Sequence, residues 1–192
     1  LDQGEFEEAL SLYSRIIGNE GTQDNIRRAA KSGMAEALSN LGQHTEANEI
    51  WEGLLRENLD PVESQHIEVL LAYSKLQAND LEGAKLAFSS LRQSSDAVIR
   101  YQGMMGLAET SKLSGELEKS KEVYARILES QPNQEIQIQV WQELAQIAQE
   151  QESTEDVLIA WKNILQFSVD DEALRSEAHT SIARALAEMN RL

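Results

Sequence analysis

Residues 114–133 read SGELEKSKEVYARILESQPN, a polar stretch with a few regularly spaced apolar positions. Tyr124 follows Ser120 by four residues and precedes Ile127 by three, so these three side chains share one face of a helix. A Ser-Gly pair opens the stretch and a Gln-Pro pair closes it, and both pairs are typical of turns. The stretch therefore predicts one amphipathic helix bounded by two turns.

The same pattern occurs five times along the 192-residue chain. The segments that align without gaps are FEEALSLYSRII (6–17), HTEANEIWEGLL (44–55), LEGAKLAFSSLR (81–92), LEKSKEVYARIL (117–128) and TEDVLIAWKNIL (154–165). Each has an aromatic ring at the same position, and the rings are Tyr13, Trp51, Phe88, Tyr124 and Trp161, with steps of 38, 37, 36 and 37 residues. An aliphatic residue follows each ring by three positions, and a mostly small residue precedes it by four. This constant spacing predicts an internal repeat.

The segments between these copies repeat with the same period. Each contains a large apolar residue followed by alanine, and the pairs are Met34-Ala35, Leu71-Ala72, Leu107-Ala108, Leu144-Ala145 and Ile182-Ala183. Each repeat is therefore expected to pair a first helix, which carries the alanine, with a second helix, which carries the ring. A bulky ring of one helix can then lie over an alanine of its neighbour.

The whole chain is expected to be all-α. Apolar residues recur at spacings of three and four almost everywhere, and no segment alternates with period two for long enough to form a sheet. Asp60-Pro61 supplies an N-cap acid followed by a proline at the first helical position. Each hairpin carries apolar residues on more than one side, so it buries them only by stacking on the next hairpin. The sequence thus predicts a solenoid of antiparallel helix hairpins.

We expect one repeat domain over residues 1–192. Its predicted elements are a lone second helix over 3–18, hairpins over about 24–57, 61–93, 96–130 and 133–167, and a final first helix over 171–190. This order predicts a fragment of a longer chain, with apolar surface exposed at its first helix. The final helix can be either a solubilising cap or the first half of another repeat.

These residues resemble the tetratricopeptide repeat, whose signature is W-x2-L-G-x2-Y in the first helix and A-x3-F followed by P around the second, with a period of about 34 residues. The second helices match best, as in the step from Ala9 to Tyr13. The first helices depart from the signature, because alanine replaces its glycine and its tyrosine is missing. The residues at that tyrosine position are Leu38, Lys75, Ser111, Ala148 and Leu186. The resemblance implies a right-handed α-α superhelix.

The resemblance also implies where a partner binds. In tetratricopeptide proteins the first helices line a concave groove, in which extended or helical segments of other proteins dock. The matching candidates in this chain are Ser32, Glu36, His66, Val69, Tyr73, Met105, Glu109, Gln142, Gln146 and Arg184. We expect Val69, Tyr73 and Met105 to form an apolar patch and the Gln-rich segment 139–150 to form a polar face. Two plainer interpretations stay open: the apolar residues pack against neighbouring helices, and the Gln-rich face is merely solvated.

The charge of the chain restricts the class of partner. With 33 acidic and 17 basic residues, the chain has a formal net charge of −16, which argues against nucleic-acid binding because that binding depends on clustered Lys and Arg. Tetratricopeptide domains that clamp the acidic C-termini of chaperones line their groove with Lys, Arg and Asn. Here Glu36 and Glu109 stand in that column and would repel such a tail. The sequence therefore favours a basic or amphipathic protein segment as the partner.

No motif in the sequence predicts catalysis, metal binding or cofactor binding. The three histidines, His44, His66 and His179, lie in different repeats without the spacing of metal ligands, and the chain has no cysteine. Glycine-rich phosphate loops and nucleophile motifs are missing. No apolar run approaches the roughly 18 residues that a membrane span needs. We expect no enzymatic activity, no metal, no cofactor and no membrane insertion by this segment.

Three hypotheses for function follow from the sequence. The first is a non-enzymatic scaffold that binds another protein in the groove. The second is self-assembly, giving a homo-oligomer, or a structural link between the domains of a longer chain. The third is a regulatory segment of a larger enzyme or signalling protein. Both the bacterial cytoplasm and the cell envelope suit the composition, so the sequence selects neither.

Overall fold

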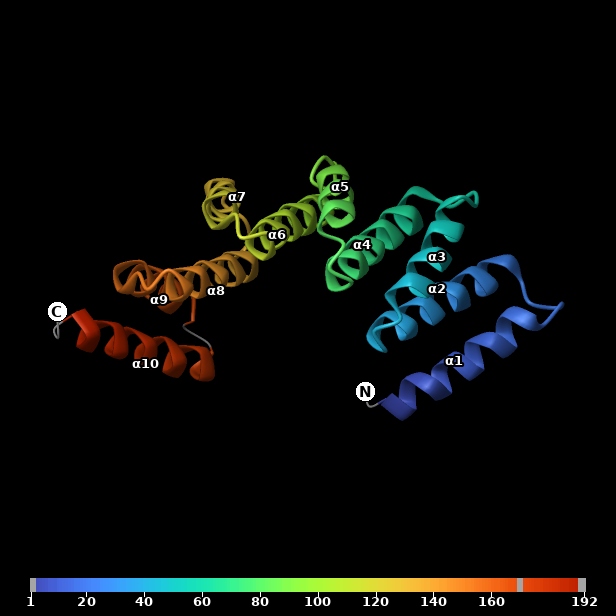
Figure 1. Cartoon of the computed structure of the whole chain (residues 1–192), viewed down its shortest axis with the longest axis horizontal. Helices are drawn as coiled ribbons and strands as arrows, with labels where there is room; N and C mark the ends of the chain where they lie inside the picture. Colours follow the sequence, from blue (N-terminus) through green and yellow to red (C-terminus); the bar gives the residue numbers. More distant parts are fainter. Residues whose placement is uncertain (1–2, 169–170, 190–192) are drawn as a thin grey trace. The chain divides into compact units, whose positions relative to one another are not determined.

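A computed structural model describes residues 3–168 and 171–189, and these residues form ten α-helices and no strand (Figure 1). The helices are α1 (Gln3–Gly18), α2 (Asp24–Asn40), α3 (His44–Leu55), α4 (Pro61–Gln77), α5 (Leu81–Leu91), α6 (Ala97–Leu113), α7 (Leu117–Glu129), α8 (Gln134–Glu150), α9 (Thr154–Phe167) and α10 (Glu172–Met189). The all-α prediction is confirmed. The predicted last residue of the final helix, Asn190, lies outside the described residues.

Helix α4 begins where the sequence predicts. The side chain of Asp60 accepts hydrogen bonds from the backbone N–H groups of Val62 and Glu63, both at 2.9 Å, and Pro61 occupies the first helical position. The carboxylate satisfies two N–H groups that have no partner inside the helix, and proline has no N–H to satisfy. The first helix of this repeat is therefore fixed at its N-terminus by local chemistry alone.

The turns that join first to second helices share one conformation. After α2, Gly42 has a φ of +77°, its N–H donates to the carbonyl of Ser39, and the N–H of Gln43 donates to the carbonyl of Leu38, both at 2.9 Å. These two bonds close the helix C-terminus in the manner of a Schellman motif. Both bonds recur after α4, α6 and α8, and the residues with positive φ are Gly42, Asn79, Gly115 and Glu152. Their steps of 37, 36 and 37 residues add a backbone column to the two side-chain columns.

The core consists of small clusters, each built from one second helix and the first helices on either side of it. Around α3, the buried residues are Ala35 from α2, Ala47, Trp51 and Leu54 from α3, and Ile67 and Leu71 from α4. Around α9, they are Ala145 from α8, Ala160, Trp161 and Ile164 from α9, and Ala178 from α10. The buried ring and the alanine of the adjacent first helix meet in both clusters. This is the packing that the two columns predict.

Helices α5 and α6 approach one another closely because α6 carries two glycines. A Cβ atom added to Gly103 would lie 2.3 Å from the backbone nitrogen of Arg92, and one added to Gly106 would lie 2.2 Å from the ring of Phe88. Both positions therefore have no room for a side chain. The G-x-x-G spacing of Gly103 and Gly106 in α6 therefore serves close helix packing.

The chain divides into two compact units, residues 1–110 and 111–192, with the boundary inside α6. In the first unit, an ion pair of 2.7 Å joins Lys31, in the middle of α2, to Glu57, two residues after the end of α3, as expected for an antiparallel hairpin. In the second unit, the side chain of Gln134 at the start of α8 donates to the carbonyl of Phe167 at the end of α9. The predicted single repeat domain and superhelix stay predictions.

Candidate protein-interaction surface

The centre of the candidate surface in the first unit is Tyr73 on α4. Its ring lies edge-on against Phe88 of α5, with a centroid distance of 5.0 Å and an interplanar angle of 75°. Such an arrangement directs the positive edge of one ring at the face of the other. Tyr73 is half-buried, so one part of the side chain is held by the core and another part is available to solvent.

An acidic neighbour affects the Tyr73 phenol. Burial and, to a smaller extent, the negative charge of Glu109 on α6 raise the pKa of Tyr73 to about 12. The phenol is therefore neutral and able to donate a hydrogen bond throughout the physiological range. Glu109 stands one residue after the alanine of α6, as Tyr73 does in α4, so the two residues share one column of the first helices.

The other predicted residues of the first unit differ in exposure. Glu36 and His66 are exposed, and Ser32 and Met105 are half-buried. Val69 is only 6% exposed, because its side chain packs in the core cluster that contains Phe88. Val69 therefore offers little surface to a partner, and the apolar part of the candidate surface consists of Tyr73 and Met105.

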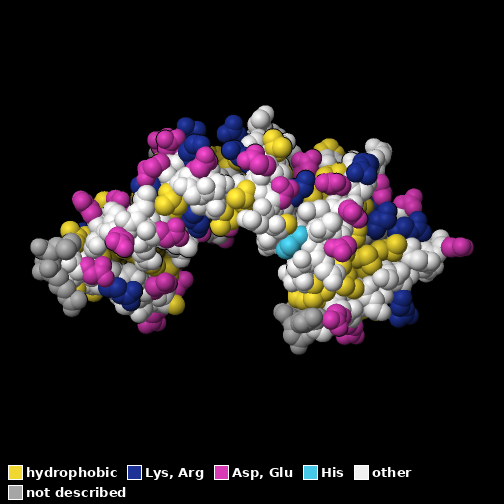
Figure 2. All heavy atoms as spheres, in the orientation of Figure 1, with side chains coloured by type: hydrophobic (Ala, Val, Ile, Leu, Met, Phe, Trp, Pro, Cys, Tyr) yellow, Lys and Arg dark blue, Asp and Glu magenta, His cyan; other side chains and the backbone are white. Residues whose placement is uncertain are grey.

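Glu36 contributes uncompensated charge to this surface. Among the residues that the structure describes, no basic side chain and no hydrogen-bond donor pairs with its carboxylate, whereas Glu57 and Glu63 pair with Lys31 and Arg28. An exposed carboxylate without a partner keeps its full attraction for a cation. Figure 2 shows that acidic side chains are widespread on the visible face of the protein.

The second unit carries Gln142, Gln146 and Arg184. Gln142 is exposed on α8, and the side-chain oxygen of Gln146 accepts a hydrogen bond of 3.2 Å from Lys112. The same Lys112 forms an ion pair of 2.6 Å with Glu143, and its side chain is only 13% exposed. This lysine neutralises part of the Gln-rich face, which consequently has fewer free carboxylates than its sequence suggests.

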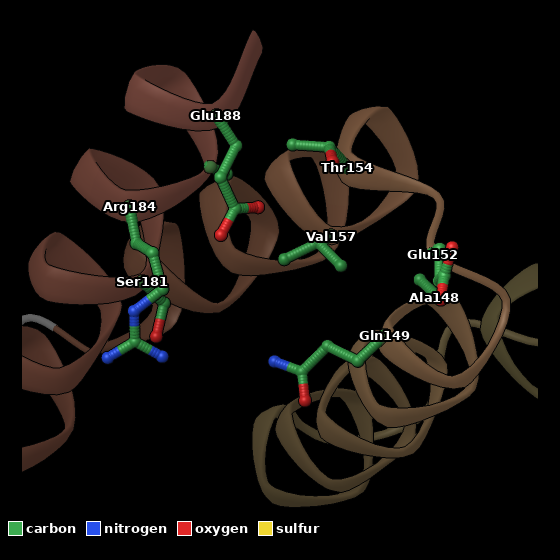
Figure 3. A pocket seen from close by; sticks show the side chains of 9 residues that line it. Ala148, Gln149, Glu152, Thr154, Val157, Ser181, Arg184 and Glu188 are labelled. Atoms are coloured by element: carbon green, nitrogen blue, oxygen red, sulfur yellow. The ribbon is translucent and has the colours of Figure 1, made fainter. Parts of the chain in front are cut away.

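Arg184 borders an open cleft of about 330 Å³ between α8, α9 and α10 (Figure 3). Gln149 of α8 and Val157 of α9 extend towards this cleft, while Arg184 and Glu188 approach it from α10. Within the described part of the chain, Arg184 has no ion pair. The cleft combines one cation, two glutamates and small apolar residues.

A polar cluster surrounds His44, and no motif in the sequence indicates it. The hydroxyls of Ser39 and Ser74 lie 3.2 and 3.4 Å from Nδ1 of this histidine, and Ser39 also lies 3.4 Å from the side-chain oxygen of Gln77. A serine beside a histidine can suggest a nucleophile and its base. Ser74, however, is only 1% exposed, so no substrate can reach it. The cluster connects α2, α3 and α4.

The described residues offer no metal site, since no three His, Asp or Glu side chains converge in residues 3–168 and 171–189. Over the same part of the chain, no helix combines the length and apolar character of a membrane span. No protein-family model matches the sequence, and no curated protein matches it either.

Proposed function

We propose that this protein is a non-enzymatic scaffold of tetratricopeptide type, which binds a basic or amphipathic segment of another protein along its first helices. Tyr73 is the anchor residue in this proposal, and Glu36 of α2 and Met105 and Glu109 of α6 are the further contacts that the first helices of the same unit offer. The repeats provide rigidity, and the variable residues of the first helices provide specificity.

The observation that carries this proposal is the half-buried ring of Tyr73, which the core holds edge-on against Phe88 while part of it stays open to solvent. Tyrosine is enriched among the residues that dominate binding energy, because it buries much area and has few rotatable bonds. The edge-on contact with Phe88 already restricts the ring, so little conformational entropy remains to be lost on binding. The adjacent carboxylate can select a partner that presents Lys or Arg next to an apolar side chain.

A synthetic peptide of about 18 residues, five helical turns, can test this proposal. It carries leucines on one helical face and lysines on the other, and its control has glutamate in place of every lysine. We expect the 192-residue protein to bind the basic peptide and not the acidic one. Affinity is measured by titration calorimetry at two salt concentrations, and binding of the basic peptide should weaken as salt increases.

Charge reversal distinguishes a defined surface from general acidity. The double variant Glu36→Lys/Glu109→Lys should bind the basic peptide roughly tenfold more weakly, because two attractive charges become repulsive. The control Glu46→Lys/Glu122→Lys changes the net charge equally, at exposed positions of the second helices α3 and α7. Equal losses in the two variants would refute the assignment of this surface.

Two substitutions at Tyr73 test whether its aromatic ring anchors the partner. Tyr73→Phe keeps the edge-on contact with Phe88 and should retain most of the affinity, whereas Tyr73→Ala removes the anchor and should lose roughly tenfold or more.

A further inference from the structure

The hairpin of α8 and α9 contains a pocket of about 110 Å³ with a mostly apolar lining. Trp141, Leu144 and Ala148 line it from α8, and Ile159 and Ala160 line it from α9. Ala148 and Ala160 are buried, and the ring of Trp141 packs against the core cluster around α9. Ile159, in contrast, is 45% exposed. The core therefore holds the apolar lining in place, and the pocket is open to solvent at Ile159.

The other hairpins carry charged side chains at the aligned positions, so the repeats act as an internal comparison. Three columns meet at the pocket: four residues before the alanine of the first helix, three residues after that alanine, and two residues before the ring of the second helix. The four sets are Lys31, Leu38 and Glu49; Glu68, Lys75 and Leu86; Met104, Ser111 and Glu122; and Trp141, Ala148 and Ile159. Only the last set has no charged residue and combines two large apolar residues with a small one.

Helix α4 shows what occupies the corresponding position in the first unit. Lys75 of α4 forms an ion pair of 3.3 Å with Glu52 of α3, and its side chain is only 22% exposed. The aligned residues of α8 and α7 are Ala148 and Ala125, which have no atoms beyond Cβ and form no such pair. The second unit thus lacks the side chains that bridge this position in the first unit, and the pocket lies beside Ala148.

Polar side chains border the pocket and leave one negative charge without an ion pair. Lys121 of α7 lies 3.3 Å from Glu118 and donates a hydrogen bond of 3.2 Å to Gln151, whose amide donates one of 2.9 Å to Glu118. Hydrogen bonds from Gln151 and Lys121 lower the pKa of Glu118, so this network stays ionised and closed. Asp156 of α9 accepts a hydrogen bond of 2.8 Å from Ser153 and, within the described part of the chain, has no ion pair.

The volume and charge of the pocket define one kind of occupant. A dry apolar cavity of about 150 Å³ binds benzene, so 110 Å³ has room for a smaller group such as a leucine or isoleucine side chain. We propose that the pocket takes one branched aliphatic side chain of a partner protein, and that a neighbouring Lys or Arg of the partner contacts Asp156. An apolar anchor inside a polar border is typical of the residues that dominate binding energy. This site goes beyond the surface around Tyr73, because it belongs to the other unit.

A short peptide and the tryptophans of the chain test the proposal. The probe is acetyl-Gly-Lys-Leu-Lys-Gly-amide, and the indole N–H signals of Trp51, Trp141 and Trp161 are followed by NMR in the labelled 192-residue protein. We expect the Trp141 signal to shift and saturate in the millimolar range, and the Trp51 signal, from the first unit, to shift little. Alanine in place of the peptide's leucine should weaken binding about tenfold or more, because the aliphatic group no longer fills the pocket. No Trp141 shift at about 10 mM peptide, or equal affinity for the two peptides, overturns the proposal.

Two variants that alter the pocket locate the binding without changing the charge. Ala148→Leu fills the pocket with the residue type that α2 carries in this column, and it should weaken binding at least about tenfold. Ile159→Ser shortens the exposed wall, so the fold should persist and binding should weaken about threefold. Leu86→Ser is the matched control, because Leu86 stands in the same column of α5 and is 74% exposed. Unchanged binding by Ala148→Leu, or equal affinities of Ile159→Ser and Leu86→Ser, would contradict the assignment of the pocket.

The charge of Asp156 is tested separately. Asp156→Asn keeps an oxygen that accepts the Ser153 hydrogen bond and removes the charge. The unaltered protein should prefer the lysine peptide to acetyl-Gly-Glu-Leu-Glu-Gly-amide, and Asp156→Asn should lose most of this preference. Glu122→Gln, at an exposed residue of α7 outside the pocket, should keep it, and equal losses in the two variants would refute the role of Asp156.

The pocket and the surface around Tyr73 can fail independently. Tyr73→Ala should leave the Trp141 titration with the short peptide unchanged, because the two residues belong to different units. A loss in Tyr73→Ala as large as that in Ala148→Leu would place the short peptide on the first unit and overturn the proposed pocket.

Discussion

Gly103→Ala tests the packing of α5 against α6, because the usual effect of this change and the structural effect have opposite signs. In an unobstructed helix, alanine in place of glycine stabilises by about 1 kcal/mol. At Gly103, the added Cβ would lie 2.3 Å from the backbone nitrogen of Arg92 and 2.7 Å from the carbonyl carbon of Leu91. These atoms belong to the main chain at the C-terminal end of α5, so they cannot rotate away, and the two helices must separate.

The expected cost follows from this separation. Inserting a methyl group into a packed interface typically costs about 1–3 kcal/mol, and the separation also loosens Leu91, which is 2% exposed. These losses exceed the helix-propensity gain, so we expect Gly103→Ala to destabilise the first unit by about 2 kcal/mol. With a urea m-value of about 2 kcal/mol/M, the unfolding midpoint should fall by about 1 M.

Gly53→Ala is the matched control in α3. A Cβ added to Gly53 meets no atom within 4 Å, so this variant should gain about 0.5–1 kcal/mol from helix propensity alone. Both variants are compared by urea unfolding monitored by far-ultraviolet circular dichroism. If Gly103→Ala proves as stable as Gly53→Ala, the close approach of α5 and α6 is wrong.

Three further predictions concern the repeat columns and the candidate surface. Ile127→Ala should lower the free energy of unfolding, measured in urea, by about 3 kcal/mol because Ile127 is fully buried. Ile16 stands at the same column position but is 37% exposed, so Ile16→Ala should cost about 1 kcal/mol, and equal costs would contradict this difference in burial. Glu152→Gly should increase the free energy of unfolding by about 1 kcal/mol and raise the melting temperature, because Glu152 has a φ of +55° that glycine adopts without strain. A lower melting temperature would contradict the turn conformation. In an ultraviolet titration Tyr73 should ionise near pH 12. Because the folded chain favours the neutral phenol, the contribution of Tyr73 to the free energy of unfolding should be full below pH 10 and should fall between pH 10 and 12. Glu109→Gln should lower the pKa of Tyr73 only in part, since burial is the larger cause of the shift.

The repeat pattern predicted the helices because it reports local chemistry. The N-cap at Asp60 and the ring column depend on residues near one another in sequence, and each is present as predicted. The turn column of Gly42, Asn79, Gly115 and Glu152 was not predicted, since only two of its members are glycine. The repeat period of 36 or 37 residues was the one signal in the sequence that could have predicted these turns, because a backbone conformation can recur where the residue type does not.

The candidate surface was harder to predict than the helices. In α4 apolar residues occur around most of the circumference, so sequence alone does not show whether Val69 faces the core or a partner. The structure places Val69 in the core and leaves Tyr73 half-buried, four residues later. The alanine column wrongly predicted burial of Ala183 for a related reason. An alanine of this column is buried only where a second helix packs against it, and the described residues include no second helix at that position. Tertiary contacts, which periodicity does not encode, decided both cases.

The most direct test of the proposed binding surface is a map of where a basic amphipathic peptide contacts the protein. Backbone amide signals of the isotopically labelled protein are recorded by NMR during titration with the lysine–leucine peptide. The account predicts that the largest shifts occur on the first helices, around Glu36, Tyr73 and Glu109, and that the signals of Glu46 and Glu122 on the second helices change little. Shifts concentrated on the second helices, or spread evenly over all acidic residues, would contradict a first-helix binding surface.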